Sequence, residues 1–353
     1  MDYKATLEHL LETVIRENGS DLHLSAGNYP TIRVDDALIP LQSHAELTAE
    51  DTLGFVTHFL SPEQKEIFLQ DKEMDFSYNH KGKARFRGNS FFQQGKISIA
   101  LRLVPGVIKT LEELNLPPIL ESFAQRKQGF FLVVGPVGQG KTTTLAAMIE
   151  IINSERSEHI VIIEDPIEYL HKNKKSIIAQ REVGSDTESF HTALHSVFRQ
   201  DVDVIMVGEM RGLDTISAAV TAGETGHLVF STLHTNDEPQ TIDRIIDSFP
   251  GDQQDQIRLQ LASSLIGIFS IRLVPRISGG LIPAYELLIN NTAVANLIRE
   301  ARTHEIKTVI ETSSELGMID MNRSLADLVR RGEINPEDAF ARSINPDGLE
   351  RLL

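Results

Sequence analysis

Residues 135–142 read G-P-V-G-Q-G-K-T and directly follow the apolar run F-F-L-V-V at 130–134. The stretch matches the pattern G-x-x-x-x-G-K-[ST], whose glycines let backbone N–H groups converge on a phosphate. The segment that follows, T-T-T-L-A-A-M-I-E, is typical of a helix, so the loop lies between a strand and a helix, as this motif requires. The alternative is a tight strand-to-helix turn that carries a surface lysine. Motif and context together favour a phosphate-binding loop.

The motif gives each residue of the loop a role. Its backbone N–H groups and the positive end of the following helix would surround the phosphates. Lys141 would bind the β and γ phosphates, and the Thr142 hydroxyl would bind Mg²⁺ directly. The predicted cofactors are therefore ATP and Mg²⁺. The predicted nucleotide-binding residues are Gly135, Pro136, Val137, Gly138, Gln139, Gly140, Lys141, Thr142 and Thr143.

The chain from residue 118 to residue 353 predicts an α/β domain. Apolar runs alternate with helical segments, which is typical of a parallel sheet covered on both faces. The runs lie at 130–135, 160–163, 203–207 and 228–233, and the helical segments at 141–153, 190–199 and 213–222. A hairpin is predicted over 272–289, with its turn at Ser278-Gly279-Gly280. The remainder predicts helices over 293–302, 305–316, 322–331 and from Asn335-Pro336 onward.

Residues 1–104 predict a smaller N-terminal α+β domain, because 353 residues are too many for one ordinary core. Apolar residues at helical spacing predict a helix over 5–17, and D-L-H-L-S and T-I-R-V predict short strands. A helix is predicted after Thr48, and the period-two alternation over 75–104 predicts a small antiparallel sheet. The prolines within 105–117 predict a linker that carries a short helix.

The composition limits where the chain works and what it binds. No stretch approaches the roughly 18 apolar residues that span a bilayer, and M-D-Y-K-A-T-L-E-H lacks the features of a signal peptide. We therefore expect a cytoplasmic protein with no transmembrane segment. The absence of cysteine excludes disulfides, a thiolate nucleophile and zinc sites built from thiolates. The net charge of -16 argues against a surface that binds nucleic acid directly.

Acidic residues follow two of the predicted strands. The run I-V-I-I ends in E-D-P-I-E, which contains Glu164, Asp165 and Glu168, and the run V-D-V-I-M-V-G-E ends in Glu209. The carboxyl ends of parallel strands meet at the edge of the sheet where the phosphate loop lies. For each residue alone, a helix cap is the favoured interpretation. Beside a phosphate loop a catalytic role is favoured, and Glu209 would order the Mg²⁺ shell through water.

The order of these blocks closely resembles the secretion ATPases of type IV pilus and type II secretion machines, and within them the pilus retraction ATPases. The resemblance lies in G-P-V-G-Q-G-K-T-T-T, I-I-E-D-P-I-E-Y, Q-R-E-V-G, V-I-M-V-G-E-M-R and T-A-G-E-T-G-H-L-V-F-S-T-L-H-T-N. It extends to S-D-L-H-L-S-A-G and A-R-F-R-G-N-S-F near the N-terminus, and so covers nearly the whole chain.

The resemblance implies a hexameric ring whose subunits have a PAS-like N-terminal domain and a RecA-like ATPase domain. It implies that ATP hydrolysis drives pilus retraction, in which pilin is disassembled and the cell moves by twitching. The implied partners are further copies of the chain in a homohexamer and the inner-membrane platform protein of the pilus machine. The implied location is the cytoplasmic side of the inner membrane, at the base of that machine.

The resemblance also implies catalytic residues. Glu168 matches the general base that activates water, Glu209 the atypical Walker B glutamate, and His234 in T-L-H-T-N the histidine near the nucleotide. The second histidine of this region is His227. About seven residues of extended strand would place His227 and His234 roughly 20 Å apart, so they cannot share one metal ion. For His227 a structural role is as compatible with the sequence as a catalytic one.

Arginines of the N-terminal domain reach the nucleotide in this family, and the resemblance assigns that role to Arg85, Arg87 and Arg102. The period of a strand places Arg85 and Arg87 on one face and Phe86 on the other, so both guanidinium groups can point into a cleft. The alternative is that these are exposed arginines that serve solubility.

The chain departs from the family pattern at several positions, namely His195, Gln200, Val202, Gly212 and Ala295. The phosphate chemistry therefore looks intact, and the coupling to the pilus is left open. Extension and secretion ATPases typically carry a four-cysteine zinc module, so the absence of cysteine favours retraction. The alternatives are a pilus extension or secretion ATPase, a ring-shaped nucleic-acid translocase or helicase, and an assembly protein that is not a motor.

Overall fold

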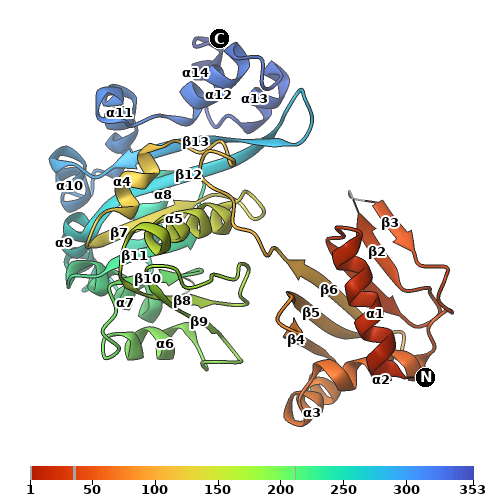
Figure 1. Ribbon diagram of the computed structural model, residues 1–353. Helices are drawn as coiled ribbons and strands as arrows, with labels where there is room; N and C mark the ends of the chain where they lie inside the picture. Colours follow the sequence, from red (N-terminus) through yellow and green to blue (C-terminus); the bar gives the residue numbers. More distant parts are fainter. Residues whose placement is uncertain (1, 35–36, 211) are drawn as a thin grey trace. The chain divides into compact units, whose positions relative to one another are not determined.

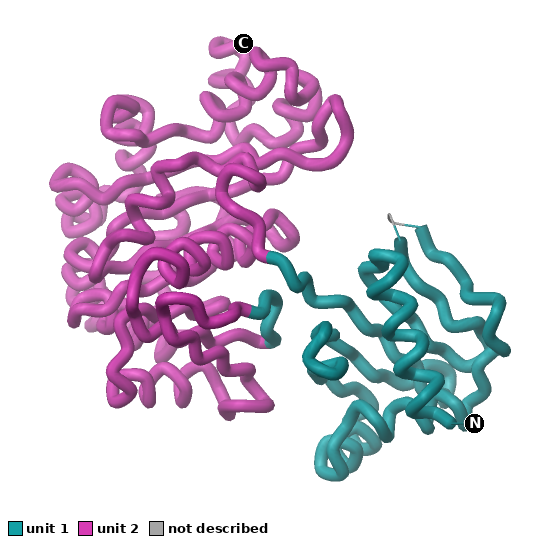
Figure 2. Tube along the Cα trace, viewed as in Figure 1, with its two compact units in different colours: residues 1–107, 166–170 teal, residues 108–165, 171–353 magenta. Residues whose placement is uncertain are grey.

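The computed structural model describes residues 2–34, 37–210 and 212–353. The chain divides into two compact units, shown in two colours in Figure 2. Unit 1 comprises Met1–Val107 together with Pro166–Leu170, and unit 2 comprises Ile108–Asp165 together with His171–Leu353. No helix among the described residues has both the length and the apolar character that crossing a membrane requires.

Unit 1 contains a six-stranded antiparallel sheet with the strand order β3-β2-β1-β6-β5-β4 (Figure 1). The strands are β1 Asp21–Ser25, β2 Thr31–Val34, β3 Ala37–Pro40, β4 Glu73–His80, β5 Ala84–Gln93 and β6 Lys96–Val104. The helices are α1 Tyr3–Arg16, α2 Ala49–Phe59 and α3 Pro62–Asp71. The predicted antiparallel sheet over 75–104 is confirmed as β4, β5 and β6, whereas β3 and α3 were not predicted.

Local sequence explains the elements of unit 1. In α1 the side chains of Leu7, Leu10, Leu11 and Val14 are buried at helical spacing. The helix predicted after Thr48 begins with a capping box, in which the backbone N–H of Thr48 donates to Asp51 Oδ2 at 2.8 Å. The element not predicted, α3, buries only Phe68, so its apolar pattern is too weak to be recognised.

Unit 2 is built on a seven-stranded sheet with the order β13-β12-β7-β11-β10-β8-β9. The first five strands along the chain, all parallel, are β7 Gly129–Val134, β8 His159–Glu164, β9 Ile177–Glu182, β10 Val204–Val207 and β11 Leu228–Leu233. β12 Leu265–Pro275 runs parallel to β7, and β13 Leu281–Ile289 pairs antiparallel with β12. The predicted hairpin over 272–289 is therefore longer than expected, and its strands belong to the same sheet.

Helices cover both faces of this sheet, as predicted. Along β7, Phe130, Leu132 and Val134 belong to one core, and Phe131 and Val133 belong to the other. The first core contains α6 Phe190–Val197, α7 Leu213–Glu224, α8 Glu238–Asp247 and α9 Gln254–Ser264. The second contains α4 Ile119–Ala124 and α5 Lys141–Glu155. The short helix predicted within 105–117 instead begins after Pro118, as α4.

The C-terminal part of unit 2 is helical, as predicted, and part of it packs on the β12–β13 hairpin. Its helices are α10 Thr292–Arg299, α11 Ile306–Thr312, α12 Met321–Arg330, α13 Pro336–Arg342 and α14 Pro346–Glu350. The single helix predicted over 305–316 is wrong in its limits. Only α11 is α-helical there, because the chain tightens into 3₁₀ turns at 303–305 and 314–316 and turns at Gly317, which has a φ of 93°.

The strand order has one direct consequence for function. β7, β11, β10 and β8 are neighbours in this order and all run in the same direction, so their carboxyl ends lie at one edge of the sheet. The loop at 135–140, His234 and Glu209 directly follow three of these ends. The fold therefore brings together residues that are far apart in the sequence.

Candidate active site

The phosphate loop connects β7 to α5 and requires glycine at defined positions. The φ angles of Gly135, Gly138 and Gly140 are 145°, 75° and 85°, values that side chains with a Cβ disfavour. At Gly135 an added Cβ would lie 2.5 Å from the carbonyl oxygen of Ile271 on β12. The loop therefore follows a path against β12 that only glycine permits at this point.

Two side chains hold the loop in place. Gln139 Oε1 accepts a hydrogen bond from the backbone N–H of Leu273 at 2.8 Å, which ties the loop to β12. Thr144 Oγ1 donates to the carbonyl of Gly140 at 2.9 Å within the first turn of α5. The N-cap, Gly140, has no side chain to cap the helix, so the first N–H groups of α5 and its positive dipole end are directed at the loop.

Lys141 is held inside the loop and is only 7% exposed. Its Nζ donates to the carbonyls of Gly135 at 2.9 Å and Pro136 at 2.8 Å, and lies 3.4 Å from His234 Nδ1. The positive charge is thus held where the motif places a phosphate.

His234 lies between the loop and the end of β10. One ring nitrogen faces Lys141, and the other, Nε2, lies 3.5 Å from Glu209 Oε2. Lys141, His234 and Glu209 thus form a row. The Glu209 side chain is 16% exposed and the His234 side chain is 44% exposed, so His234 is the member of the row that contacts solvent most. Three residues proposed from separate sequence blocks, Lys141, Glu209 and His234, therefore lie together.

Hydroxyl groups fix β11 against the loop that follows β10. Ser231 Oγ donates to the carbonyl of Val207 at 2.8 Å, and Thr232 Oγ1 donates to the carbonyl of Gly208 at 2.6 Å. Gly208 directly precedes Glu209, so these bonds set the distance between Glu209 and the strand that leads to His234. Sequence analysis assigned no role to Ser231 or Thr232. The S-T pair at the end of a buried strand is the signal that marks them.

The stretch E-D-P-I-E at 164–168, which we call the acidic box, has different surroundings at its two ends. Glu164 ends β8, is 4% exposed, and accepts a hydrogen bond from Gln180 Nε2 at 3.4 Å. Its Cγ would lie 3.4 Å from a Cβ added at Gly208, so it packs beside the strand that leads to Glu209. Glu168 lies in Pro166–Leu170, which belongs to unit 1, whereas the phosphate loop belongs to unit 2. Its role as general base remains a prediction.

His227 has a structural contact. Its Nδ1 lies 3.2 Å from the carbonyl of Ala222 near the end of α7, and its ring makes an edge contact with Phe198 at 5.6 Å between centroids. This geometry matches a histidine that closes a helix end. Among the described residues, no group of three or more His, Cys, Asp or Glu side chains is arranged to hold a metal ion.

The residues present fit Mg²⁺ bound together with a nucleotide. Thr142 is the second residue of α5 and offers a hydroxyl, and Glu209 offers a carboxylate just after the end of β10. Mg²⁺ usually takes one or two protein oxygens and completes its shell with water and phosphate, so it needs no cage of several carboxylates. Thr142 and Glu209 supply this type of donor set.

The predicted arginines lie on the sheet of unit 1. Phe86 is fully buried and Arg87 is exposed, which confirms that they face opposite sides of β5. In the strand register Arg87 lies opposite Arg102, and Arg102 lies opposite Asp21 on β1. Arg102 Nε binds Asp21 Oδ1 at 2.9 Å. Arg85 lies two residues before Arg87 and so shares its face.

A fourth arginine, Arg33, was not predicted. It lies opposite Asp21 on β2, with its Nε 3.9 Å from Asp21 Oδ2. Arg87, Arg102, Asp21 and Arg33 thus form a row across β5, β6, β1 and β2, which we call the arginine row. Arg87 and Arg102 are like charges directly opposite each other, an arrangement that destabilises a sheet.

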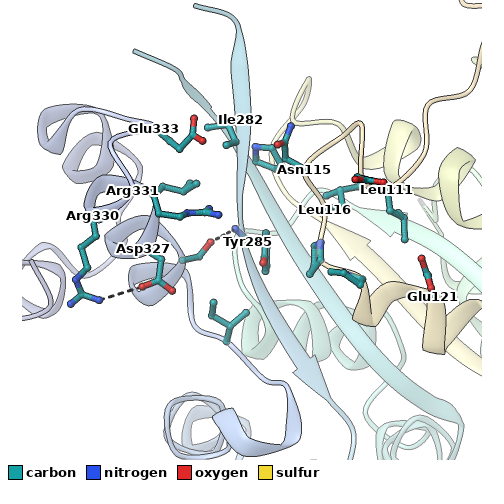
Figure 3. Close-up of a pocket in the computed structure, with 17 residues that line it drawn as sticks. Leu111, Asn115, Leu116, Glu121, Ile282, Tyr285, Asp327, Arg330, Arg331 and Glu333 are labelled. Carbon is teal, nitrogen blue, oxygen red and sulfur yellow. Dashed lines mark hydrogen bonds and ion pairs between the residues drawn. The ribbon is translucent and has the colours of Figure 1, made fainter. Parts of the chain in front are cut away.

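A cavity of about 730 Å³ in unit 2 contains none of the predicted site residues. Figure 3 shows Leu116 on one side of the outer strand β13, and Asp327 and Arg331 of the C-terminal helices on the other. Ser324 Oγ accepts from the N–H of Tyr285 at 3.1 Å, and Pro283 has no N–H to donate. These features protect the edge of the sheet from pairing with another chain.

The residues that depart from the family pattern differ in their exposure to solvent. Ala295 is 7% exposed in the core of unit 2, and Val202 is 8% exposed in the same core. Gly212 is the N-cap of α7, and a Cβ there would meet nothing within 4 Å, so an acidic residue would fit. Arg211, which precedes it in the G-E-M-R block, lies outside the described residues. His195 and Gln200 are exposed.

Comparison with known proteins finds relatives along nearly the whole chain. The profile of the family described as type II/IV secretion system protein matches residues 3–308. The type IV pilus retraction ATPase PilT of Pseudomonas aeruginosa is 40% identical over 347 residues, 97% of this chain and 99% of that protein. The twitching motility protein of Neisseria gonorrhoeae is 45% identical over 305 residues, 86% of this chain and 82% of that protein. The crystal structure of the pilus retraction motor PilT with bound ADP matches with a TM-score of 0.91 and 45% identity over 98% of each chain.

The two histidines give a matched test of this site. Replacing His234 with alanine removes the group between Lys141 and Glu209, and we expect kcat for ATP hydrolysis to fall about 10- to 100-fold. Replacing His227 with alanine removes only a contact at a helix end, so we expect a loss of about 1 kcal/mol in stability and a nearly unchanged kcat. Steady-state kinetics and thermal unfolding of both variants decide this. Equal losses of kcat would contradict the assignment.

Proposed function

The chain belongs to the type II/IV secretion system protein family, and from this premise we propose that it is an ATP-hydrolysing motor that drives retraction of type IV pili. The α/β class and the resemblance inferred from the sequence are confirmed. The observation that carries the function is the row Lys141, His234 and Glu209 at three adjacent strand ends, within a chain that matches retraction ATPases over almost its full length.

We propose that the phosphates of ATP bind in the loop at 135–140 and at the start of α5. Lys141 then exchanges the carbonyls of Gly135 and Pro136 for oxygens of the β and γ phosphates. Thr142, directly, and Glu209, through water, would hold Mg²⁺, which neutralises charge on the phosphates when bound. His234 holds Glu209 at a fixed distance from the lysine.

We propose Glu168 as the general base. It follows Pro166 in the acidic box, in which Glu164 ends a buried strand. Glu164 is enclosed and hydrogen-bonded, and Asp165 directly adjoins the strand end. Glu168 is the residue of this box farthest from the strand end, so it is the carboxylate least constrained by the strand and the one we expect to orient a water molecule.

We propose that the arginine row of unit 1 supplies positive charge to the phosphates during the cycle. Arg87 and Arg102 repel each other across the strand pair, and Asp21 compensates only part of their charge. A triphosphate would relieve that repulsion, and its cleavage would remove the reason for the arginines to stay engaged. Arg85, on the same face, would contribute to the same surface.

The partners and location follow from the same proposal. Further copies of this chain would complete a homohexameric ring, and the ring would act on the inner-membrane platform protein of the pilus machine. The chain would thus work at the cytoplasmic base of the pilus. The acidic composition, with a net charge of -16, opposes a function on nucleic acid.

Replacing Glu168 with glutamine tests the general base. We expect kcat for ATP hydrolysis to fall about 100-fold or more, because the amide cannot accept the proton of the attacking water. Nucleotide affinity and ring assembly should remain near wild type, measured by titration with a fluorescent ATP analogue and by size-exclusion chromatography. Unchanged turnover would assign the base to another residue. Glu155→Gln, an exposed glutamate at the end of α5, is the control.

Replacing Arg87 with alanine tests the arginine row. We expect kcat to fall roughly 100-fold with a smaller change in nucleotide affinity, because donors aimed at developing charge act mainly in the transition state. Lys96→Ala removes the same charge from the exposed first residue of β6 in the same unit and should leave kcat near wild type. Equal kcat values for the two variants would indicate that Arg87 is only a surface charge without a role in hydrolysis.

Deletion of the gene in its host tests the direction of the motor. If the chain drives retraction, cells should carry excess, static pili and should lose twitching, because pilin is added but not removed. Time-resolved imaging of labelled pili measures this, and expression of the wild-type chain is the control. Bald cells would support an extension ATPase instead, and unchanged pili would indicate that another motor performs the retraction.

A further inference from the structure

Two acidic residues that the sequence did not mark are buried together behind the active site. Glu238 is the first residue of α8 and is fully buried. Glu286 lies on β13 and is 6% exposed. We call them the acid pair. A buried carboxylate without compensating charge destabilises a fold severely, so a pair of carboxyl groups in one interior site requires an explanation.

The acid pair is directly connected to the loop that carries His234. That loop comprises Thr235, Asn236 and Asp237, and Glu238 follows it without a break. Ser270 Oγ on β12 donates to the carbonyl of Asn236 at 3.2 Å, and Ser270 lies opposite Glu286 in the ladder of β12 and β13. The backbone of the loop and the acid pair are therefore fixed to the same two strands.

The two carboxyl groups differ in their surroundings. Glu286 Oε2 accepts a hydrogen bond from the N–H of Met321 at 3.1 Å, at the start of the ten-residue helix α12, where the helix dipole favours a negative charge. Neither oxygen of Glu238 has a hydrogen-bond donor in the described residues. Burial, and then the neighbouring Glu286 carboxylate, raise the pKa of Glu238 well above its ordinary value. Glu238 is thus the protonated member of the acid pair.

The nearby cations on other elements attract both members of the acid pair, but each makes its direct bond to another group. Lys307 on α11 binds Asp237 Oδ2 at 2.9 Å, and this bond keeps the pKa of Lys307 raised although burial lowers it. Arg272 on β12 donates through Nη1 to the carbonyl of Arg342, on α13, at 2.6 Å, and burial lowers the pKa of Arg272. An ionised Glu238 would therefore be a second buried anion beside Glu286, with Asp237 adjoining it.

We propose that the acid pair is a positioning element for His234, in which one proton shared between Glu238 and Glu286 keeps the start of α8 against β13. Loss of that proton from Glu238 to solvent would leave two carboxylates facing each other. Their repulsion would displace the start of α8 and with it the loop at 235–237, and His234 would leave its place between Lys141 and Glu209. A cavity of about 110 Å³ that is lined by Glu286 and Lys307 lies beside one member of the pair. This inference rests on the role of His234 in the proposed function.

The variant Glu238→Gln tests this positioning role, because glutamine has the shape of a protonated carboxyl group and cannot ionise. The measurement is kcat for ATP hydrolysis by the full chain with Mg²⁺, from slightly acidic to alkaline pH. We expect wild-type kcat to fall on the alkaline side with little change in KM, and the variant to keep its neutral kcat there, several-fold above wild type. Superimposable profiles would overturn the proposal. Asp247→Asn, an exposed carboxylate at the end of the same helix, should follow wild type.

A second readout separates this inference from the proposed function. A carboxyl group whose pKa is raised in the fold stabilises it below the ordinary pKa of glutamate, and this contribution is lost as pH rises toward the raised pKa. The unfolding temperature of wild type should therefore fall relative to that of Glu238→Gln as pH rises. Parallel curves would overturn the shared proton even if the chain hydrolyses ATP, and a chain without ATPase activity would overturn the function instead.

Two further outcomes are decisive. If Glu238→Gln does not fold, Glu286→Gln tests the same repulsion, because removing the second charge should also weaken the alkaline fall of kcat. If the unfolding curves diverge as expected while the kcat profiles superimpose, the shared proton exists but does not position His234, and the positioning role is overturned.

Discussion

The candidate active site depends on one constraint, which is that β7, β11 and β10 run parallel as immediate neighbours. Each strand end contributes a single chemical group, namely the phosphate loop with Lys141, then His234, then Glu209. None of these groups would work alone. A lysine in a glycine loop binds phosphate, but hydrolysis needs a carboxylate at a defined distance from it. The hydrogen bonds from Ser231 and Thr232 to the neighbouring strand keep that distance from varying.

Much of this site could be predicted from the sequence, because its groups occur in short continuous blocks. The loop follows an apolar run, and Glu209 and His234 end two others, so parallel pairing alone brings them together. The parts that were missed depend on pairing between distant segments or on weak patterns. β9 is an edge strand with little burial, so it shows no clear alternation. The place of Arg33 opposite Asp21 depends on antiparallel register, which composition and periodicity do not reveal.

Each unit places two side chains of like charge close together, and the repulsion between them is relieved in a different way in each unit. In unit 1 two arginines face each other on an exposed surface, where water weakens their repulsion and a ligand of opposite charge can remove it. In unit 2 two carboxyl groups face each other in the interior, where water cannot weaken the repulsion and a proton must remove it. The first arrangement suits a surface that binds and releases an anion. The second suits a contact that must stay closed during turnover.

The contacts behind His234 also define a route from the nucleotide to the C-terminal helices. The N-cap of α8, Asp237, binds Lys307 of α11, and Glu286 binds the start of α12. Asp243 of α8 accepts a hydrogen bond from Thr303, in the turn that joins α10 to α11. A displacement of the His234 loop would therefore act on α11, on α12 and on the 3₁₀ turn between α10 and α11 through these hydrogen bonds and this ion pair. Ala295, one of the departures from the family pattern, lies on α10 beside this route and is buried in the core. A larger side chain at this position would therefore have to displace core neighbours next to the route.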